Sequence, residues 1–384
     1  MTSPTGSVTG GVDAHTDTHD AAALDERGRL LGVRTFQSTP DGNRALLAWL
    51  EAFGPVAVIG VESTGSYAAG LVRYLRSRQV GVVEVNRPHA HARRRRGKSD
   101  PIDAEMAARQ ALAGHATVIP KRTDGTVEAI RQLRLARESA IKARTAAFNQ
   151  LTELVVTAPD ELRQHLRQRK TSRGRATLCA RLRPDLDRLY EPTQAAKLAL
   201  RSLARRIGEL DREIAALDEH LKPLVASAAP RTTQLLAIST GHAGQLLVTA
   251  GENIDRLRND GAFAALCGAS PIPVSSGRRD RHRLNHGGDR DANRTLHMIA
   301  VCRLRFCERT RAYAERRTAE GKTKPDIIRC LKRYIAREVF HALTADLADL
   351  ALPTPSAAPT APAPATVLTI NCGAGPIGRT RRRT

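Results

Sequence analysis

The amino-acid sequence predicts an α/β N-terminal domain followed by a mostly helical remainder. Two patterns along the chain lead to this fold class. Short apolar runs alternate with segments of helical spacing as far as about residue 122, which is typical of an α/β domain. Beyond that point, Leu and Ile recur at steps of three and four over a long stretch, which indicates long helices.

The first 85 residues divide into seven expected elements. Three strands come first, followed by a helix, a strand, a helix and a strand, with a further helix beyond the next loop. The expected elements are Val8–Val12, Ala21–Leu24, Leu30–Phe36, Asp41–Phe53, Val56–Val61, Ser66–Arg78 and Val80–Val85. This is the order of an RNase H-like domain, although the periodicity also permits other α/β folds.

Composition shifts divide the chain into four expected regions. The α/β domain is expected at 1–122, a helical region with a coiled-coil pattern at 123–228, and a mostly helical C-terminal domain at 229–350. Residues 351–384 are rich in Pro and Ala and end in a run of Arg, so we expect a disordered basic tail.

The helical region contains an apolar seam with the a/d spacing of a coiled coil. Its members are Leu200, Leu203, Ile207, Leu210, Ile214, Leu217 and Leu221. The seam can close a helical hairpin within one chain or pair two subunits, and the pattern does not choose between them. The stretch Arg163–Arg183 is rich in Arg, Lys and Gln, as a segment lying on nucleic acid would be.

Charge is the strongest feature of the composition. The 384 residues include 61 Lys and Arg against 39 Asp and Glu, a formal net charge of +22. Such an excess indicates a polyanionic partner, most simply nucleic acid. Only 3% of the residues are aromatic, which argues against a platform of rings stacked along a single strand. A basic nucleic-acid-binding protein without catalytic activity has the same composition and stays an alternative.

The sequence shows no sign of a membrane or secreted protein. No apolar run reaches the roughly eighteen residues that span a bilayer, and the start MTSPTGSVTGG does not resemble a signal peptide. Six scattered Cys do not form a disulfide framework. We therefore expect a cytoplasmic protein with no membrane partner.

Four acids have the placement of a metal site. Asp13 and Glu62 each follow an apolar strand, and Asp100 and Asp103 are three apart, on one face of a helix. Phosphodiester chemistry with Mg²⁺ needs several carboxylates gathered on a rigid support. Asp100 and Asp103 also suit the first turn of a helix with Pro101 at its first position, so capping explains that pair as well. We interpret His15 as a structural residue.

A basic loop precedes Asp100 and Asp103 in the sequence. It contains Arg93, Arg94, Arg95 and Arg96. A solvated charge run is one interpretation, and a contact with phosphates beside the acids is the other.

Four sequence blocks together resemble the DEDD transposases of the insertion-sequence-110 family. Three are acidic blocks: GVDAHTDTH at residues 11–19, VESTGSY at 61–67 and KSDPIDA at 98–104. The fourth, LCGASPIPVSSG at 266–277, is similar to the C-terminal block of the same family. The likeness extends over about residues 8–345, nearly the whole chain.

The resemblance implies a RuvC-like domain whose acids, here Asp13, Glu62, Asp100 and Asp103, bind Mg²⁺, with two ions expected. It also implies a C-terminal transposase domain with a nucleophilic serine. That serine corresponds to Ser276, with Ser275 one residue away as the alternative. The arginines expected to hold the scissile phosphate and its neighbours are Arg278, Arg279, Arg281, Arg283, Arg290 and Arg294.

The resemblance further implies the partners. They are the DNA of the element ends and target, a structured non-coding bridge RNA, and further copies of the chain in a dimer or tetramer with composite sites. It also implies a bacterial protein associated with the nucleoid. Within enzymes, a metal-dependent junction-resolving nuclease would use the same acids with water as nucleophile, so that function stays open beside strand transfer.

Overall fold

The computed structural model describes residues 6–85, 100–253, 257–274, 282–283 and 285–351. Within these residues, no helix is long and apolar enough to cross a membrane. The expected basic tail lies outside the described residues from Leu352 onward.

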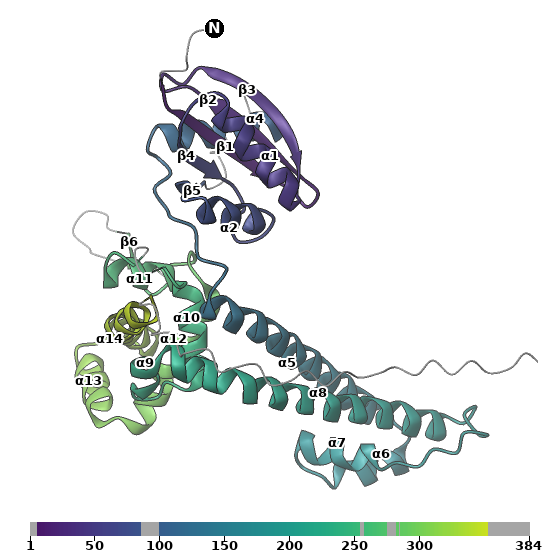
Figure 1. The fold of residues 1–384 in the computed structure, drawn as a ribbon. Helices are drawn as coiled ribbons and strands as arrows, with labels where there is room; N and C mark the ends of the chain where they lie inside the picture. Colours follow the sequence, from purple (N-terminus) through teal and green to yellow (C-terminus); the bar gives the residue numbers. More distant parts are fainter. Residues whose placement is uncertain (1–5, 86–99, 254–256, 275–281, 284, 352–384) are drawn as a thin grey trace, which may run out of the picture. The chain divides into compact units, whose positions relative to one another are not determined.

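The N-terminal domain is a five-stranded mixed sheet flanked by helices (Figure 1). Strands β1 (Val8–Ala14), β2 (Thr18–Leu24) and β3 (Leu30–Gln37) are antiparallel, and β4 (Val56–Val61) and β5 (Val82–Glu84) run parallel to β1. The strand order 3-2-1-4-5 confirms the predicted RNase H-like arrangement. The sheet is accompanied by α1 (Pro40–Glu51), α2 (Ala69–Ser77) and α4 (Asp100–Leu112).

One apolar core holds α1 and α2 against the sheet. Leu46 of α1 and Leu71 of α2 are fully buried in one cluster with Val12 and Ile59 of the sheet. Helix α2 begins at Ala69 and not at Ser66 as predicted. The reason is a turn after β4, where Ser63 has a φ of 55° and its carbonyl oxygen accepts from the amide of Ser66 at 3.0 Å.

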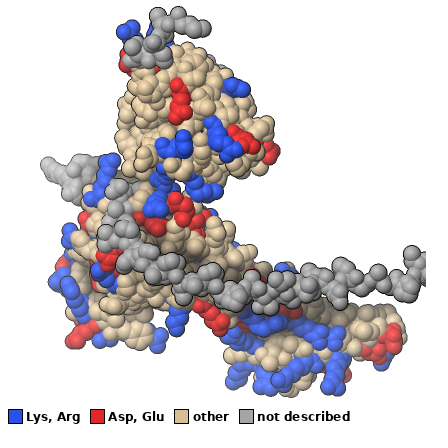
Figure 2. Space-filling view, in the orientation of Figure 1, with Lys and Arg blue, Asp and Glu red and all other residues tan. Residues whose placement is uncertain are grey.

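The region from 126 to 228 is built on a helical hairpin. Helices α5 (Thr126–Thr157) and α8 (Pro192–Ala228) lie side by side along much of their length (Figure 1). Two short helices, α6 (Asp160–Arg167) and α7 (Ser172–Ala180), connect them. Lys and Arg side chains gather over this connecting pair (Figure 2).

The predicted seam is used inside this hairpin. The four a-type residues Leu200, Ile207, Ile214 and Leu221 are buried, and the d-type residues Leu203, Leu210 and Leu217 are half-buried. Across the hairpin, Arg144 of α5 donates to Asp211 of α8 at 2.7 Å. Of the two predicted uses of the seam, the structure therefore shows packing within one chain.

The C-terminal part packs around a core that it shares with the start of α5 and the end of α8. Its elements are α9 (Pro230–Gln234), α10 (Thr240–Ala250), α11 (Asp260–Leu266), β6 (Ile272–Pro273), β7 (His282–Arg283), α12 (Arg290–Phe306), α13 (Glu308–Ala319) and α14 (Lys324–Ala351). Phe263 is fully buried at the centre, among residues of α10, α12 and α14. The predicted mostly helical character of residues 229–350 is confirmed by α9 to α14. The pairing of β6 with β7 was missed, because two-residue strands leave too little periodicity to detect.

Candidate active site

Helix α4 lies directly on β1 and β4 because two glycines leave room for it. A Cβ at Gly11 would meet the carbonyl oxygen of Ala104 and the amide nitrogen of Ala108 at 2.2 Å each. A Cβ at Gly60 would lie 2.6 Å from the carbonyl oxygen of Ala107. The helix side in contact is a stripe of buried small residues, Ala104, Ala107, Ala108 and Ala111. This close approach fixes where the first turn of α4 lies relative to the strand ends.

Alternation along the strands puts Asp13 and Glu62 on the face that α4 covers. Asp13 lies two residues after Gly11 on β1, so both point to the same side of the sheet. Glu62 is related to Gly60 in the same way, just after β4. The amide of Glu62 donates to the carbonyl oxygen of Val12 at 3.0 Å, which continues the parallel pairing. Both acids are buried, each with 8% of its surface exposed.

The first turn of α4 brings two further acids to Asp13. Asp100 is the first residue of the helix, and Asp103 is buried on its sheet-facing side. Burial raises the pKa of Asp13, and the negative charges of Asp103 and Asp100 raise it further. The carboxylates therefore lie close enough to repel one another, as the sequence predicted for a metal site.

A fifth acid, Asp20, was not singled out from the sequence. It lies on β2 directly opposite Asp13 in the antiparallel pairing, is buried, and contributes to the raised pKa of Asp13. The hydroxyl of Thr35 donates to it at 2.6 Å. Like charges directly opposite each other destabilise a strand pair, which adds to the need for a cation here. The sequence did not reveal Asp20 as a member of the cluster, because its position opposite Asp13 depends on the register of the β1–β2 hairpin.

His15 belongs to the acid cluster, contrary to our interpretation of it as a structural residue. Its Nε2 atom lies 3.3 Å from Oδ2 of Asp13 and 3.4 Å from Oδ2 of Asp100. One ligand atom from each of these three residues fits within 4.8 Å of the others, a spacing suited to a shared metal ion. In the sequence, the only indication was that His15 lies two residues after Asp13. A histidine at that spacing is too common to identify a metal ligand.

The residues present fit a divalent cation. Carboxylate oxygens are the ligands that Mg²⁺ and Mn²⁺ prefer, and like charges buried together are costly without a counter-ion. The imidazole nitrogen of His15 adds a ligand type that suits Mn²⁺ better than Mg²⁺. Asp13, Asp100 and His15 could hold such an ion, with Asp103 and Glu62 on the same face of the sheet.

The predicted nucleophile lies outside the described residues, as does Ser275 beside it. Ser276 belongs to the segment that joins β6 to β7 in sequence. Also outside are seven of the predicted phosphate-binding residues, Arg93, Arg94, Arg95, Arg96, Arg278, Arg279 and Arg281.

The three remaining arginines flank that segment. Arg283 on β7, and Arg290 and Arg294 in the first turns of α12, are exposed. Arg294 pairs with Asp291 at 2.7 Å, so part of its charge is already compensated. These positions are compatible with phosphate contacts, with Arg283 and Arg290 the better candidates.

The loop before α12 is fixed by close packing. Gly288 has a φ of 89°, and a Cβ there would lie 2.6 Å from the amide nitrogen of Gly268. The carboxylate of Asp289 caps α12 by accepting from the amides of Asp291 and Ala292. Its other oxygen accepts from the Thr249 hydroxyl at 2.7 Å. The start of α12 is therefore held both by backbone packing and by a side-chain cap.

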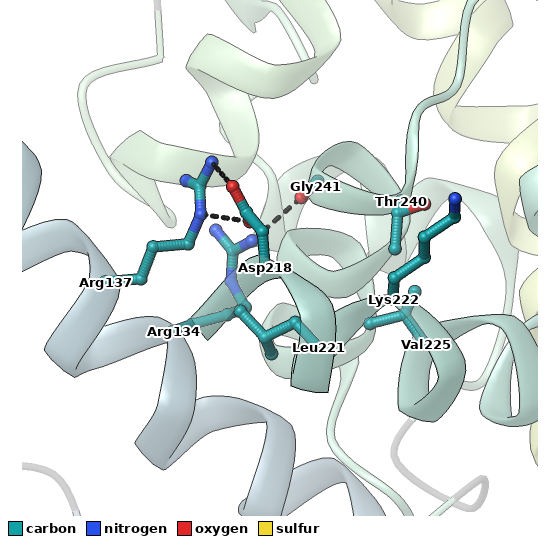
Figure 3. A pocket seen from close by; sticks show the side chains of 8 residues that line it. All are labelled: Arg134, Arg137, Asp218, Leu221, Lys222, Val225, Thr240 and Gly241. Atoms are coloured by element: carbon teal, nitrogen blue, oxygen red, sulfur yellow. Dashed lines mark hydrogen bonds and ion pairs between the residues drawn. The ribbon is translucent and has the colours of Figure 1, made fainter. Parts of the chain in front are cut away.

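A cavity with a volume of about 190 Å³ lies beside the start of α10 (Figure 3). Three cations line it, but two are already compensated. Arg137 makes two hydrogen bonds to Asp218, the shorter of 2.5 Å, and Arg134 donates to the carbonyl oxygen of Gly241 and to Glu138. The arginines that line this cavity therefore join α5 to α8 and to α10, and their charge is not available to bind a phosphate.

The fold and the acid cluster together define a polynucleotide-processing enzyme of the RNase H-like class. Two family models match the chain. The DEDD transposase model of IS110 elements, described as a transposase, matches residues 10–159, and the model described as transposase of the IS116/IS110/IS902 family matches residues 231–315. No curated protein matches the chain. The two models together cover more than half of it, and the chain belongs to the IS110 family of transposases, which are DNA strand-transfer enzymes and bind DNA.

Proposed function

We propose that this transposase excises and inserts its element by a serine mechanism, guided by a structured bridge RNA. The observation that carries the proposal is the convergence of Asp13 on β1 with Asp100 and Asp103 in the first turn of α4, with Asp13 buried among like charges. Family membership supports the reaction class. We keep the predicted division into regions 1–122, 123–228, 229–350 and 351–384 as part of this proposal.

The acids hold the metal in this proposal. Asp13, Glu62, Asp100 and Asp103 supply oxygen ligands from one face of the sheet, and His15 binds the ion or orients the two carboxylates beside it. When bound, a pair of Mg²⁺ ions activates an oxygen nucleophile and stabilises the charge on the leaving oxygen.

The nucleophile is Ser276. Its hydroxyl oxygen attacks the scissile phosphorus, giving up its proton to a base, and forms a 5′-phosphoserine ester. The bond to the 3′ oxygen breaks, and that oxygen leaves as a 3′-hydroxyl after taking a proton. The ester conserves the phosphodiester bond energy for rejoining. The arginine sets around Arg93–Arg96 and Arg278–Arg294 hold the neighbouring phosphates.

Trapping of a covalent adduct tests this mechanism. A nicked suicide substrate incubated with protein, Mg²⁺ and guide RNA should yield a protein–DNA adduct whose modified peptide maps to Ser276. The Ser276→Ala variant should lose adduct and strand transfer, while Ser275→Ala should be milder. An adduct at Ser275 moves the assignment by one residue. Cleavage by the double variant with no adduct would instead identify a junction-resolving nuclease that activates water.

The RNA partner and the oligomer are separate parts of the proposal. The formal net charge of +22 supports binding of a second polyanion beside DNA. Light scattering should give the mass of a dimer or tetramer bound to RNA. A mixture of Asp13→Ala and Ser276→Ala chains should regain some strand transfer if subunits combine into composite sites. A monomer that is fully active would contradict the composite arrangement.

A further inference from the structure

The α6–α7 connection packs on one end of the helical hairpin and shares an apolar core with it. Its helices pack on the end of α5 and the start of α8 through Leu162, Leu166, Ala176 and Cys179, all buried. This apolar cluster is distinct from the cores of the sheet and of the C-terminal part. The connection therefore presents a defined surface of its own.

That surface carries a concentrated positive charge. Residues 160–183 contain eight Arg and Lys against two acids, Asp160 and Glu161, a net charge of +6 within 24 residues. Figure 2 shows the resulting Lys and Arg surface over α6 and α7. More than a quarter of the net charge of the chain is thus gathered on a small part of it.

Most of these cations have no acid beside them. Five are exposed and form no ion pair within the described part of the chain: Arg167, Arg169, Lys170, Arg181 and Arg183. The neighbouring helix behaves differently. On α5, each of Arg131, Arg134, Arg137 and Arg144 pairs with an acid. The α6–α7 surface therefore gathers several cations that no nearby acid among the described residues neutralises.

A groove adds shape to this charge. A cavity of about 440 Å³ opens between α6, α7 and the start of α8. Leu162, Leu178 and Leu182 contribute apolar lining. Arg181, Arg183 and Lys197 contribute positive charge, which exceeds the single negative charge of Glu161. Lys197 also begins a stripe with Arg201 and Arg205, spaced four apart on one face of α8. Cations therefore extend in a row away from the groove.

We propose that the α6–α7 surface is a docking site for the phosphate backbone of a folded nucleic acid, separate from the acid cluster. This inference rests on the proposed function, since it names where such a partner binds. Unpaired Arg and Lys along a track match a polyanion with evenly spaced charges, and they carry no means of reading sequence. The contact therefore fixes the position of the nucleic acid and not its sequence.

The test removes these charges from the full chain. A variant with Arg167→Gln, Arg169→Gln, Lys170→Gln, Arg181→Gln and Arg183→Gln keeps the buried cluster intact. A matched control neutralises five scattered exposed cations, Arg27, Arg78, Lys142, Arg212 and Lys322. Anisotropy titrations use a 20-base-pair DNA duplex and an RNA hairpin of the same sequence, over a range of salt.

Loss of phosphate contacts should flatten the salt dependence. The magnitude of the slope of log affinity against log salt should decrease by about 3.5 to 4.5 in the five-site variant, because each contact contributes roughly 0.7 to 0.9. The control should change the slope by less than about 1, since its charges lie apart. The probe with the larger change identifies RNA or DNA as the partner at this surface. Equal slopes in the two variants would overturn the proposal.

Two further measurements separate this inference from the proposed function. An Asp13→Ala chain should lose strand transfer and keep the wild-type slope. The five-site variant should keep Mg²⁺-dependent cleavage at saturating nucleic acid. If neither the wild type nor any variant showed strand transfer, the proposed function would be wrong, but the salt-dependence test of the α6–α7 surface would still be valid. Loss of binding to anionic lipid vesicles, with nucleic-acid slopes unchanged, would assign the surface to a membrane and overturn the proposal.

Discussion

The acid cluster between the sheet and the first turn of α4 and the α6–α7 surface each gather side chains of one sign, in opposite environments. Asp13 and Glu62 on the sheet and Asp103 on α4 are buried where two glycines let the helix approach the strands. Arg167, Arg169 and Arg183 are exposed, above a small core shared with α5 and α8. Buried like charges repel strongly and are little screened by salt, so they suit one cation held at a fixed position. Exposed charges are screened by salt beyond roughly 10 Å, so a surface of them suits an extended polyanion whose binding weakens as salt rises.

This comparison predicts large, salt-independent effects in the first region and graded, salt-dependent effects in the second. Substitution of Asp13 by Ala should produce the largest change. Loss of a ligand that stabilises transition-state charge removes several kcal/mol, so strand transfer should decrease by roughly 10³-fold or more. Single-turnover strand transfer at several salt concentrations measures it. An activity loss that high salt modulates would contradict the assignment to a buried metal site.

Substitution of Gly11 by Ala should disrupt the cluster without touching an acid. The new Cβ would meet backbone atoms of α4 at 2.2 Å, so the helix must move. We expect a loss of about 1–3 kcal/mol in the free energy of unfolding, together with weaker Mn²⁺ binding. Gly70→Ala is the matched control, because a Cβ at this position on α2 would meet nothing within 4 Å and Ala favours helix. An unchanged free energy of unfolding for Gly11→Ala would show that α4 does not depend on its close approach to β1 at Gly11.

Substitution of His15 by Ala should weaken metal binding by roughly 10–100-fold, as for a ligand or a residue that orients ligands. Because an imidazole nitrogen favours Mn²⁺ over Mg²⁺, the loss should be larger for Mn²⁺. Electron paramagnetic resonance of Mn²⁺, with Mg²⁺ competition, measures both affinities. His115→Ala serves as the control, since His115 is exposed on the loop after α4. Equal affinities in all three proteins would return His15 to a structural role.

The smallest effect concerns stability without metal. The raised pKa of Asp13 means that the folded metal-free protein holds this proton to higher pH than the unfolded chain. Its contribution to stability is therefore present below the unfolded pKa and is lost as pH rises through the folded pKa. Asp13→Asn removes this loss, so its melting temperature at pH 7 should exceed that of the wild type by about 1–3 °C. Calorimetry in chelator from pH 4 to 8 should show the difference growing with pH, and a constant difference would contradict it.

Much of the first region followed from local pattern. The RNase H-like order was predicted because strand alternation and strand ends leave a direct trace in sequence. Asp13, Glu62, Asp100 and Asp103 were proposed as a site from strand ends, helix spacing and the family resemblance together. Asp20 was missed because its position opposite Asp13 depends on hairpin register. His15 was misjudged because its proximity to Asp100 depends on where α4 packs.

The helical hairpin and its α6–α7 surface show the same division between what local pattern predicts and what packing decides. The heptad spacing of Leu200–Leu221 predicted a seam but permitted two partners, and the hairpin with α5 selects the one within the chain. The richness of Arg163–Arg183 in cations was visible in the sequence. That α5 arginines pair with acids and those of the α6–α7 surface do not became visible only with the side chains in place.

The sequence by itself determined most of the elements, the class of fold, the candidate acids and the sign of the net charge. These depend on residue type and on spacing within a few residues, where sterics and burial act locally. The tertiary structure decided which acids meet, which histidine joins them and which cations are left without a partner. Those outcomes depend on contacts between residues far apart in the chain, such as Gly11 with Ala104, which no local period encodes.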